Sequence, residues 1–264
     1  IKKVSTDALI KDATCDFDPT STITLTERIL QPDFQQVNLQ LCKSDFVSDW
    51  EAVQMGYSAY NNLPPSFADF LISHVAAKVA QKTEQSIWNG AAANAGEFAG
   101  FTELLTADGD VTDVAAVGGG VTAANVIAQL GAVVDAIGST LYTSEDMFIY
   151  VSQNVARAYT RALGGFGAAG LGGAGTDGKG TQRYNGGGLM FDGVKIAVAN
   201  GLSDNTMVAA EKSNLYFGTG LLADQNEVKV IDMSDIDGSQ NVRVVMRFSA
   251  GVQYGIGSDI VLYS

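Results

Sequence analysis

The sequence predicts an α+β protein in which helices come first and a mainly antiparallel sheet follows. Apolar residues recur at helical spacing over residues 66–89 and 122–137, which is the pattern of helices with one buried face. Towards the end, Val242, Val244 and Met246 share one face of a stretch whose other face carries arginines, as in a half-exposed strand. A chain of 264 residues can form one large domain or two interleaved ones.

The first 44 residues carry two expected elements. Residues 1–20 are polar and aperiodic, and CDFDPT is typical of a turn, so we expect an arm that lies on another surface. Residues 21–44 alternate on both sides of QPD, which predicts an extended two-stranded hairpin. Its alternating apolar residues are Ile23, Leu25, Val37, Leu39 and Leu41. Because an isolated hairpin is marginal in water, we expect it to pack on another subunit.

Residues 66–89 predict a long helix. The proline pair at 64–65 blocks helix before it, Ser66 can cap its first turn, and Gly90 ends it. Its inward residues would be Phe67, Leu71, Val75 and Val79. His74 is the only histidine in the chain, so we interpret it as a helix-face residue with a satisfied ring nitrogen rather than as part of a catalytic pair.

Two more helices and a buried strand are expected in the middle of the chain. The helix at 122–137 would be capped by Thr122 and stopped by Gly138. Its predicted inward stripe is Val126, Ile127, Leu130, Val133, Val134 and Ile137. MFIYVS then predicts a buried strand, and SQNVARAYTRALGG a third helix. The inward residues of this third helix would be Val155, Tyr159 and Leu163, and the outward ones Arg157 and Arg161.

The last third of the chain is expected to be mostly strand. Strands are predicted in GVKIAVAN, TMVAAE, EVKVIDMS, NVRVVMRFSAGVQYGI and DIVLYS. The intervening KSNLYFGTGLLAD is interpreted as a short apolar helical or turn segment.

The glycine-rich stretch at 164–188 contains two near-matches to phosphate-binding loops. Gly165, Gly167 and Gly170 fit G-x-G-x-x-G, and GAGTDGK fits G-x-x-x-x-G-K. A nucleotide loop follows a strand and opens a helix, whereas this stretch follows a helix, and Gly180 replaces the magnesium-binding Ser or Thr. We therefore expect a mobile loop, or one that is ordered by neighbouring subunits around a symmetry axis.

Other groups of reactive residues point to no site. The aspartates of DGDVTD and DMSDIDG lack the register and the distal Glu of a calcium loop, so turns account for them better. No G-x-S-x-G elbow accompanies the serines that lie near acids. We therefore predict no catalytic residue, no cofactor and no metal, and a protein that is not an enzyme.

The composition limits the partners. The 16 Lys and Arg stand against 29 Asp and Glu, a net charge of −13, whereas wrapping nucleic acid requires clustered cations. No apolar run approaches the roughly 18 to 20 residues of a membrane span, so we expect no membrane association. Cys15 and Cys42 fit neither a disulfide framework nor a zinc spacing, so we expect reduced thiols in the cytosol.

The ordered set of elements resembles the major capsid proteins of tailed bacteriophages, the family with the Hong Kong 97-like capsid fold, which encapsulin shells share. NLYFGTGL followed by NVRVVMRFSAGVQYG and IVLY is similar to the C-terminal end of the family. EQSIWNG followed by EFAGFTELL is similar to the end of its long spine helix. The resemblance covers essentially the whole chain.

The resemblance implies a division of the chain and a set of subunit contacts. Its parts would be an N-terminal arm (1–20), an extended hairpin or E-loop (21–44), the first part of a peripheral domain (45–115) with the spine helix, an axial domain (116–222) with the glycine-rich loop, and C-terminal peripheral strands (223–264). The candidate subunit-contact residues are Ile23, Leu25, Arg28, Phe34, Val37, Leu39, Gly165, Phe166, Gly170, Arg183 and Tyr184.

The implied function is a major capsid protein that assembles in the host bacterial cytoplasm, as hexamers and pentamers, into the icosahedral shell of the virion. The shell would enclose double-stranded DNA without sequence-specific binding, and portal, scaffold and cement proteins are further expected partners. Some relatives crosslink subunits through a hairpin Lys, but residues 21–41 contain none, so no crosslink is assigned. The alternatives are an encapsulin-like compartment, a nucleotide-binding enzyme that uses residues 164–181, and an unrelated adhesin or surface-layer protein.

Overall fold

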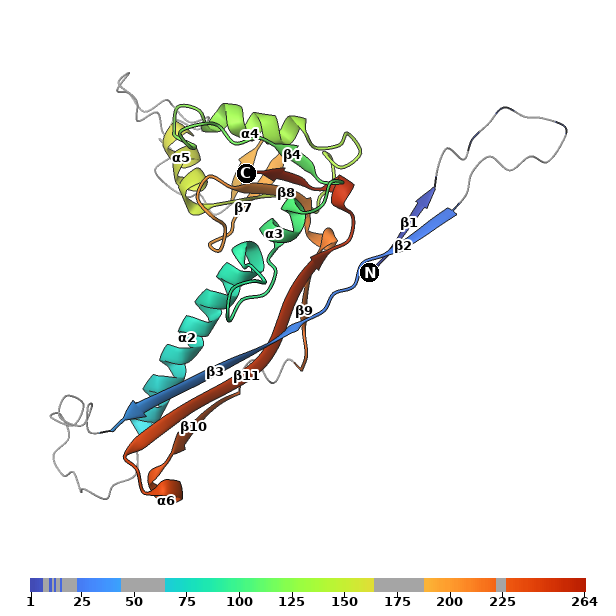
Figure 1. Ribbon diagram of the computed structural model, residues 1–264. Coiled ribbons are helices and arrows are strands. Elements are labelled where there is room, and N and C mark those ends of the chain that lie inside the picture. The colour runs from blue at the N-terminus through green and yellow to red at the C-terminus, as the bar shows by residue number, and fades with distance from the viewer. Residues whose placement is uncertain are drawn as a thin grey trace.

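The computed structural model describes residues 1–6, 10, 12, 15, 23–43, 65–163, 188–221 and 227–264. The strands of these residues form three sheets. A long sheet with one helix along it forms the lower part in Figure 1, and a six-stranded sheet with two helices forms the upper part. A two-stranded ribbon, β1 (Lys2–Thr6) and β2 (Ile23–Glu27), projects from the region where the two parts meet. The fold is therefore α+β, as predicted.

The long sheet is built around the longest strand, β11 (Asn241–Tyr254). One edge of β11 pairs with β3 (Asp33–Cys42). In addition, β10 (Val228–Asp232) pairs with the first half of β11, and β9 (Leu215–Thr219) pairs with its last residues. All these pairings are antiparallel. Val242 and Val244 of β11 are buried against the helix that lies along the sheet, because the alternation in the sequence places valines on that face and arginines on the other.

The helix along the long sheet is α2 (Pro65–Asn89), and it confirms the predicted helix at 66–89. Proline is accommodated as its first residue because the first N–H groups of a helix have no intrahelical partner, so the N–H that proline lacks would not have bonded within the helix. At its end the Gly90 N–H donates to the Ser86 carbonyl oxygen at 3.1 Å. Leu71 and Val75 are buried, as expected from their spacing. At 1.5 Å per residue, α2 is about 37 Å long and supports the whole lower part.

The six-stranded sheet has the order β4-β12-β8-β5-β7-β6. Its strands are β4 (Thr112–Val114), β12 (Val261–Tyr263), β8 (Met207–Glu211), β5 (Met147–Val151), β7 (Val194–Val198) and β6 (Leu189–Phe191). The helices α4 (Val126–Asp135) and α5 (Gln153–Leu163) pack on it through one apolar cluster. The predicted strand at MFIYVS is thus confirmed as a central strand, and the third predicted helix is confirmed as α5.

A second apolar cluster joins the upper and lower parts. It includes Trp88 at the end of α2, Phe101 and Leu105 of the short helix α3 (Phe101–Thr106), and Tyr254 at the end of β11. Strands of both sheets contribute to this cluster. The short helix α6 (Ser234–Asp237) lies at the opposite end of the long sheet. The two parts of the subunit therefore share a core.

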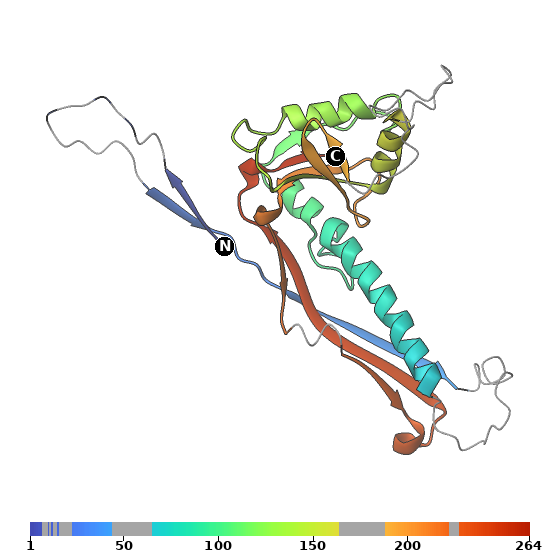
Figure 2. The ribbon, with the colours of Figure 1, turned by 180° about the vertical axis from the view of Figure 1, so that it is seen from behind.

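The predicted hairpin at 21–44 is wrong in its pairing. Residues 23–27 pair with residues 2–6, and residues 33–42 pair with β11 instead. The expected arm at 1–20 is also wrong for its first residues, since they form β1. Alternation identifies a strand but not its partner, and the five residues between β2 and β3 continue along the molecule in both views rather than turning back (Figures 1 and 2).

Smaller corrections concern helix faces and the C-terminal third. Ile127 is 51% exposed because it lies about 100° around the helix from the buried Val126. Leu163, the last residue of α5, is 38% exposed.

KSNLYFGTGLLAD contains a short 3-10 turn but continues as strand β9, which pairs with the end of β11. The C-terminal strand β12 lies in the six-stranded sheet, where it pairs with β4 and β8.

The glycines of the long sheet explain how the chain passes from the ribbon to β3. Gly218 of β9 and Gly251 of β11 face each other in register. A methyl group at Gly218 would lie 2.4 Å from Leu30 Cδ2, and one at Gly251 would lie 3.0 Å from the Gln31 carbonyl oxygen. Side chains at these two positions would therefore block the segment that crosses the sheet.

Gly201 provides a test of how the loop after β7 packs on α2. A methyl group there would lie 2.1 Å from the Glu84 carbonyl oxygen, so Gly201→Ala should reduce the free energy of unfolding by roughly 1–3 kcal/mol through overpacking. Gly131→Ala is the matched control, because Gly131 lies in α4 with no atom near its missing methyl group. This change should stabilise the subunit by about 0.5–1 kcal/mol. Urea unfolding of unassembled subunits measures the free energy of unfolding of both variants. Equal effects of the two changes would contradict the close contact between Gly201 and α2.

Candidate subunit interface

The ribbon formed by β1 and β2 has one apolar and one polar face. Val4 lies opposite Leu25 and Thr6 lies opposite Ile23. Because opposite residues of an antiparallel pair share a face, Val4, Ile23 and Leu25 lie together on one face, which is called the apolar face. The pair formed by Lys2 and Glu27 lies on the same face, at the base of the ribbon. The other face carries Lys3, Thr24 and Thr26. The ribbon thus has the pattern of a strand pair that is covered on one side.

The apolar face of the ribbon remains exposed within its own chain. Val4 is 61% exposed, and Ile23 and Leu25 are each 69% exposed. Seen from behind in Figure 2, the ribbon again projects away from α2 and from the six-stranded sheet. A two-stranded ribbon of this kind is marginal on its own, and grouped exposed apolar side chains mark interaction surfaces. The apolar face is therefore the leading candidate for a contact with another molecule.

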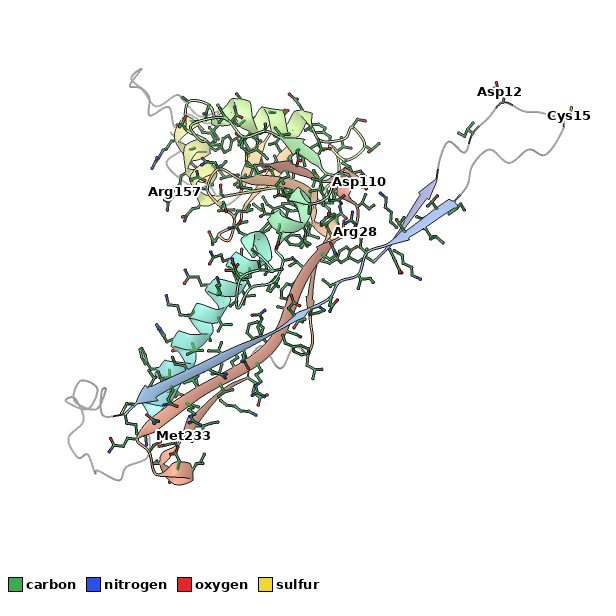
Figure 3. The ribbon with its side chains drawn as sticks, in the orientation of Figure 1. Asp12, Cys15, Arg28, Asp110, Arg157 and Met233 are labelled. Carbon is green, nitrogen blue, oxygen red and sulfur yellow. The ribbon has the colours of Figure 1, made fainter. Side chains whose placement is uncertain are left out.

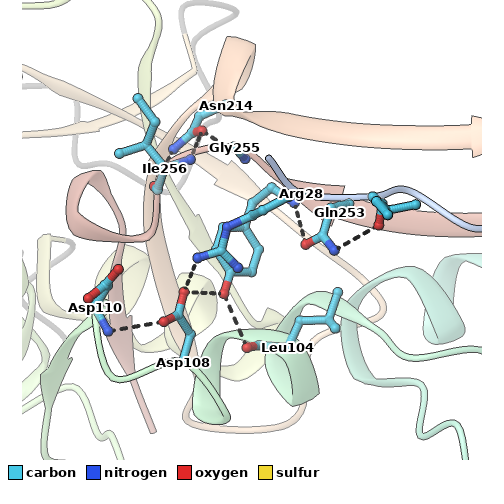
Figure 4. Close-up of polar contacts among 10 residues, drawn as sticks. Arg28, Leu104, Asp108, Asp110, Asn214, Gln253, Gly255 and Ile256 are labelled. Atoms are coloured by element: carbon cyan, nitrogen blue, oxygen red, sulfur yellow. Dashed lines mark hydrogen bonds and ion pairs between the residues drawn. The ribbon is translucent and has the colours of Figure 1, made fainter. Parts of the chain in front are cut away.

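The ribbon is held at its base by a clamp of three residues, Arg28, Asp108 and Tyr254. Figure 4 shows Arg28 beside Asp108. The Arg28 guanidinium forms an ion pair with the Asp108 carboxylate and lies 4.4 Å from the centre of the Tyr254 ring. The Tyr254 hydroxyl donates to Asp108 Oδ2 at 2.6 Å. The clamp joins the end of β2, the turn after α3 and the end of β11.

Backbone contacts reinforce the clamp. The Ile1 nitrogen donates to the Arg28 carbonyl oxygen at 2.8 Å, and the Arg28 N–H donates to the Ile1 carbonyl oxygen at the same distance. Gln253 Nε2 donates to the Ile29 carbonyl oxygen at 3.3 Å. Nearby, the Asn214 side chain accepts the N–H groups of Gly255 and Ile256 (Figure 4). The direction in which the ribbon leaves the body is therefore fixed by many contacts at one place.

The protonation states of the clamp follow from its contacts. Hydrogen bonds from the Tyr254 hydroxyl, the Asp110 N–H and Arg28 lower the pKa of Asp108 below its ordinary value. Burial and the hydrogen bond to Asp108 raise the pKa of Tyr254 to about 12. Asp108 is thus ionised and Tyr254 protonated at neutral pH, the states in which the three groups attract one another.

The sequence-predicted contact residues divide into three groups. Ile23 and Leu25 lie on the apolar face of the ribbon, and Phe34, at the start of β3, is 94% exposed. Leu39 is 38% exposed. Val37 packs against the buried residues of α2 and β11, and Arg28 belongs to the clamp, so both have partners within the chain. The remaining predicted contact residues, Gly165, Phe166, Gly170, Arg183 and Tyr184, lie outside the described residues.

Sequence reasoning missed Val4, Asp108 and Tyr254. Val4 alternates with polar residues in KKVST, a weak strand signal that stands inside the expected arm. Asp108 and Tyr254 are separated by 146 residues, so no local pattern could relate them. The aspartate turns were predicted correctly: the Asp110 N–H bonds Asp108 Oδ1 at 3.1 Å and the Ser239 N–H bonds Asp237 Oδ1 at 2.9 Å.

Reactive groups elsewhere in the described ranges form no metal cluster of three or more His, Cys, Asp or Glu side chains. His74 is exposed and its ring stacks with Phe70 at 6.1 Å. Cys15 and Cys42 are not joined by a disulfide. In the same ranges, no helix combines the length and the apolar character needed to cross a bilayer.

Comparisons with known proteins find likeness in structure rather than in sequence. No family model matches the chain, and no curated protein sequence matches it significantly. The capsid chain of the native GTA particle superposes with a TM-score of 0.59 and 12% identity, over 100% of this chain and 84% of that one. The capsid of Myoviridae phage XM1 superposes with a TM-score of 0.57 and 12% identity, over 99% of this chain and 83% of that one. The satellite phage P4 procapsid that includes the size determination protein superposes with a TM-score of 0.57 and 8% identity, over 100% of this chain and 88% of that one.

Tyr254→Phe tests the clamp, because it removes only the hydroxyl that donates to Asp108. The free energy of unfolding should fall by about 1–2 kcal/mol at pH 7, since the lost hydrogen bond is to a charged group. The contribution of Asp108 exists above its unfolded pKa of about 4 and is lost as the pH falls through its lower folded pKa. The difference between wild type and variant, measured by urea unfolding, should therefore shrink below about pH 4. A difference that is constant from pH 7 to pH 2 would contradict the clamp.

Proposed function

We propose that this chain, which has the fold of phage capsid subunits, is the major capsid (head) protein of a tailed bacteriophage. Its subunits would form hexamers and pentamers of an icosahedral shell that encloses double-stranded DNA in the virion. The proposal is supported by structural likeness over essentially the whole chain to subunits from three capsids. The fold alone does not specify a function, so the proposal also needs an observation from the chain itself.

The observation that carries the proposal is the exposed apolar face of the ribbon. Its three side chains are 61–69% exposed in the single subunit. Burying them on a neighbour would contribute about 1–2 kcal/mol each, since complete burial of such a side chain is worth about 1.5–3 kcal/mol. Each subunit in a ring gives one ribbon and receives one, so a modest contact is repeated throughout a closed shell.

The charge of the subunit is compatible with a shell around DNA. A net charge of −13 gives little general attraction to phosphate, so packaged DNA would be enclosed without sequence-specific binding. Portal, scaffold and cement proteins are the further partners we propose, with assembly in the host bacterial cytoplasm. No observation in the described ranges favours the encapsulin-like alternative or an enzyme, and the glycine-rich loop that would serve a nucleotide lies outside them.

Charged substitutions on the ribbon test the role of its apolar face. Ile23→Lys with Leu25→Lys should leave a folded subunit but abolish particles, because lysines cannot be buried on a neighbour without a partner. Thr24→Lys with Thr26→Lys makes the same charge change on the polar face of the same strand and should still give particles. Electron microscopy scores assembly and circular dichroism confirms folding. Normal particles from the apolar-face variant would refute the proposed role.

A further inference from the structure

The six-stranded sheet of the upper part has two edges of opposite charge. Strand β4 forms one edge and β6 the other, and within the described ranges neither has a second strand beside it. Exposed acidic residues lie at the first edge and exposed arginines at the second. Open sheet edges are places where another chain can approach closely.

The basic edge consists of Arg157 and Arg161 of α5. They are four residues apart and therefore lie on one exposed face of the helix. No acidic residue occurs in α5, and neither arginine forms an ion pair with another described residue. The Tyr159 hydroxyl donates to the Met190 carbonyl oxygen at 2.7 Å, which fixes α5 beside β6. Two like charges are thus held together without an ion-pair partner among the described residues.

The acidic edge consists of Asp110 and Asp113, just before and within β4. Both are exposed, and neither forms an ion pair with another described residue. The nearby cation Arg28 is already paired with Asp108. These two carboxylates are therefore available to a cation from outside the subunit.

The two edges lie on opposite sides of the upper part, as Arg157 and Asp110 show in Figure 3. Arg28, where the ribbon leaves the body, lies on the same side as Asp110. A molecule on that side can therefore meet the acidic edge and the ribbon together. The opposite side of the same subunit presents the complementary charge, which is the requirement for a head-to-tail contact between identical copies.

We propose that the partner at both edges is a second copy of this chain: Arg157 and Arg161 of one subunit pair with Asp110 and Asp113 of the next in a closed ring. This inference rests on the proposed function and specifies which surfaces meet. In subunits of net charge −13, which repel one another overall, a local cationic patch also selects the register of approach. The contact should weaken as salt is raised, because it lies at the surface.

Charge exchange tests the pairing. Arg157→Glu with Arg161→Glu, or Asp110→Lys with Asp113→Lys, should each reduce particle yield by about tenfold or more at low salt, as like charges then face each other. The variant carrying all four changes has the wild-type net charge and should recover most of the yield. Arg157→Lys with Arg161→Lys is the conservative control and should assemble. A 1:1 mixture of the two reversal variants should form six-fold rings, because alternating copies then match at every contact.

The outcomes separate this inference from the proposed function. If wild type and both reversal variants assemble alike, the protein forms shells but the edges do not pair. If the reversal variants are folded and fail while the four-change variant also fails, the edges contact something other than each other. If folded wild-type protein forms no particles, the proposed function is wrong and the pairing is wrong with it. Yield by sedimentation and electron microscopy, with circular dichroism for folding, distinguishes all three results.

Discussion

The interaction of Arg28 with Asp108 and Tyr254 sets the position of the base of the ribbon on this subunit. The ribbon has no core of its own, so its direction is set at its base, where the guanidinium is held between a carboxylate and an aromatic ring. Tyr254 is 1% exposed and belongs to the core shared by both parts of the subunit. The clamp therefore connects the position of an exposed apolar surface to the core that both parts of the subunit share.

The isolated subunit leaves several requirements unmet. Apolar side chains stay exposed on the ribbon, and the upper part carries arginines on one side and aspartates on the other without partners among the described residues. Each feature alone reduces the stability of the single subunit only slightly. Together they fit a protein that completes its interactions only in a symmetric assembly, where every surface is used once per copy.

The sequence predicts the local structure of this protein better than its pairing. The proline pair at 64–65 and the Ser66 cap located the start of α2 within one residue of its observed start, and alternation correctly placed arginines on the outer face of β11. The partner of β2 could not be predicted, because apolar and polar residues alternate in both β1 and β3, and alternation does not show which of the two pairs with β2. The clamp could not be predicted either, since Arg28, Asp108 and Tyr254 come together only after the whole fold has formed.

Cryo-electron microscopy of particles formed by the purified wild-type protein shows where each ribbon lies in the assembly. We expect closed icosahedral shells in which Val4, Ile23 and Leu25 of each ribbon are buried against a neighbouring subunit. Soluble monomers only, or shells in which the ribbon folds back onto its own subunit, would contradict this expectation.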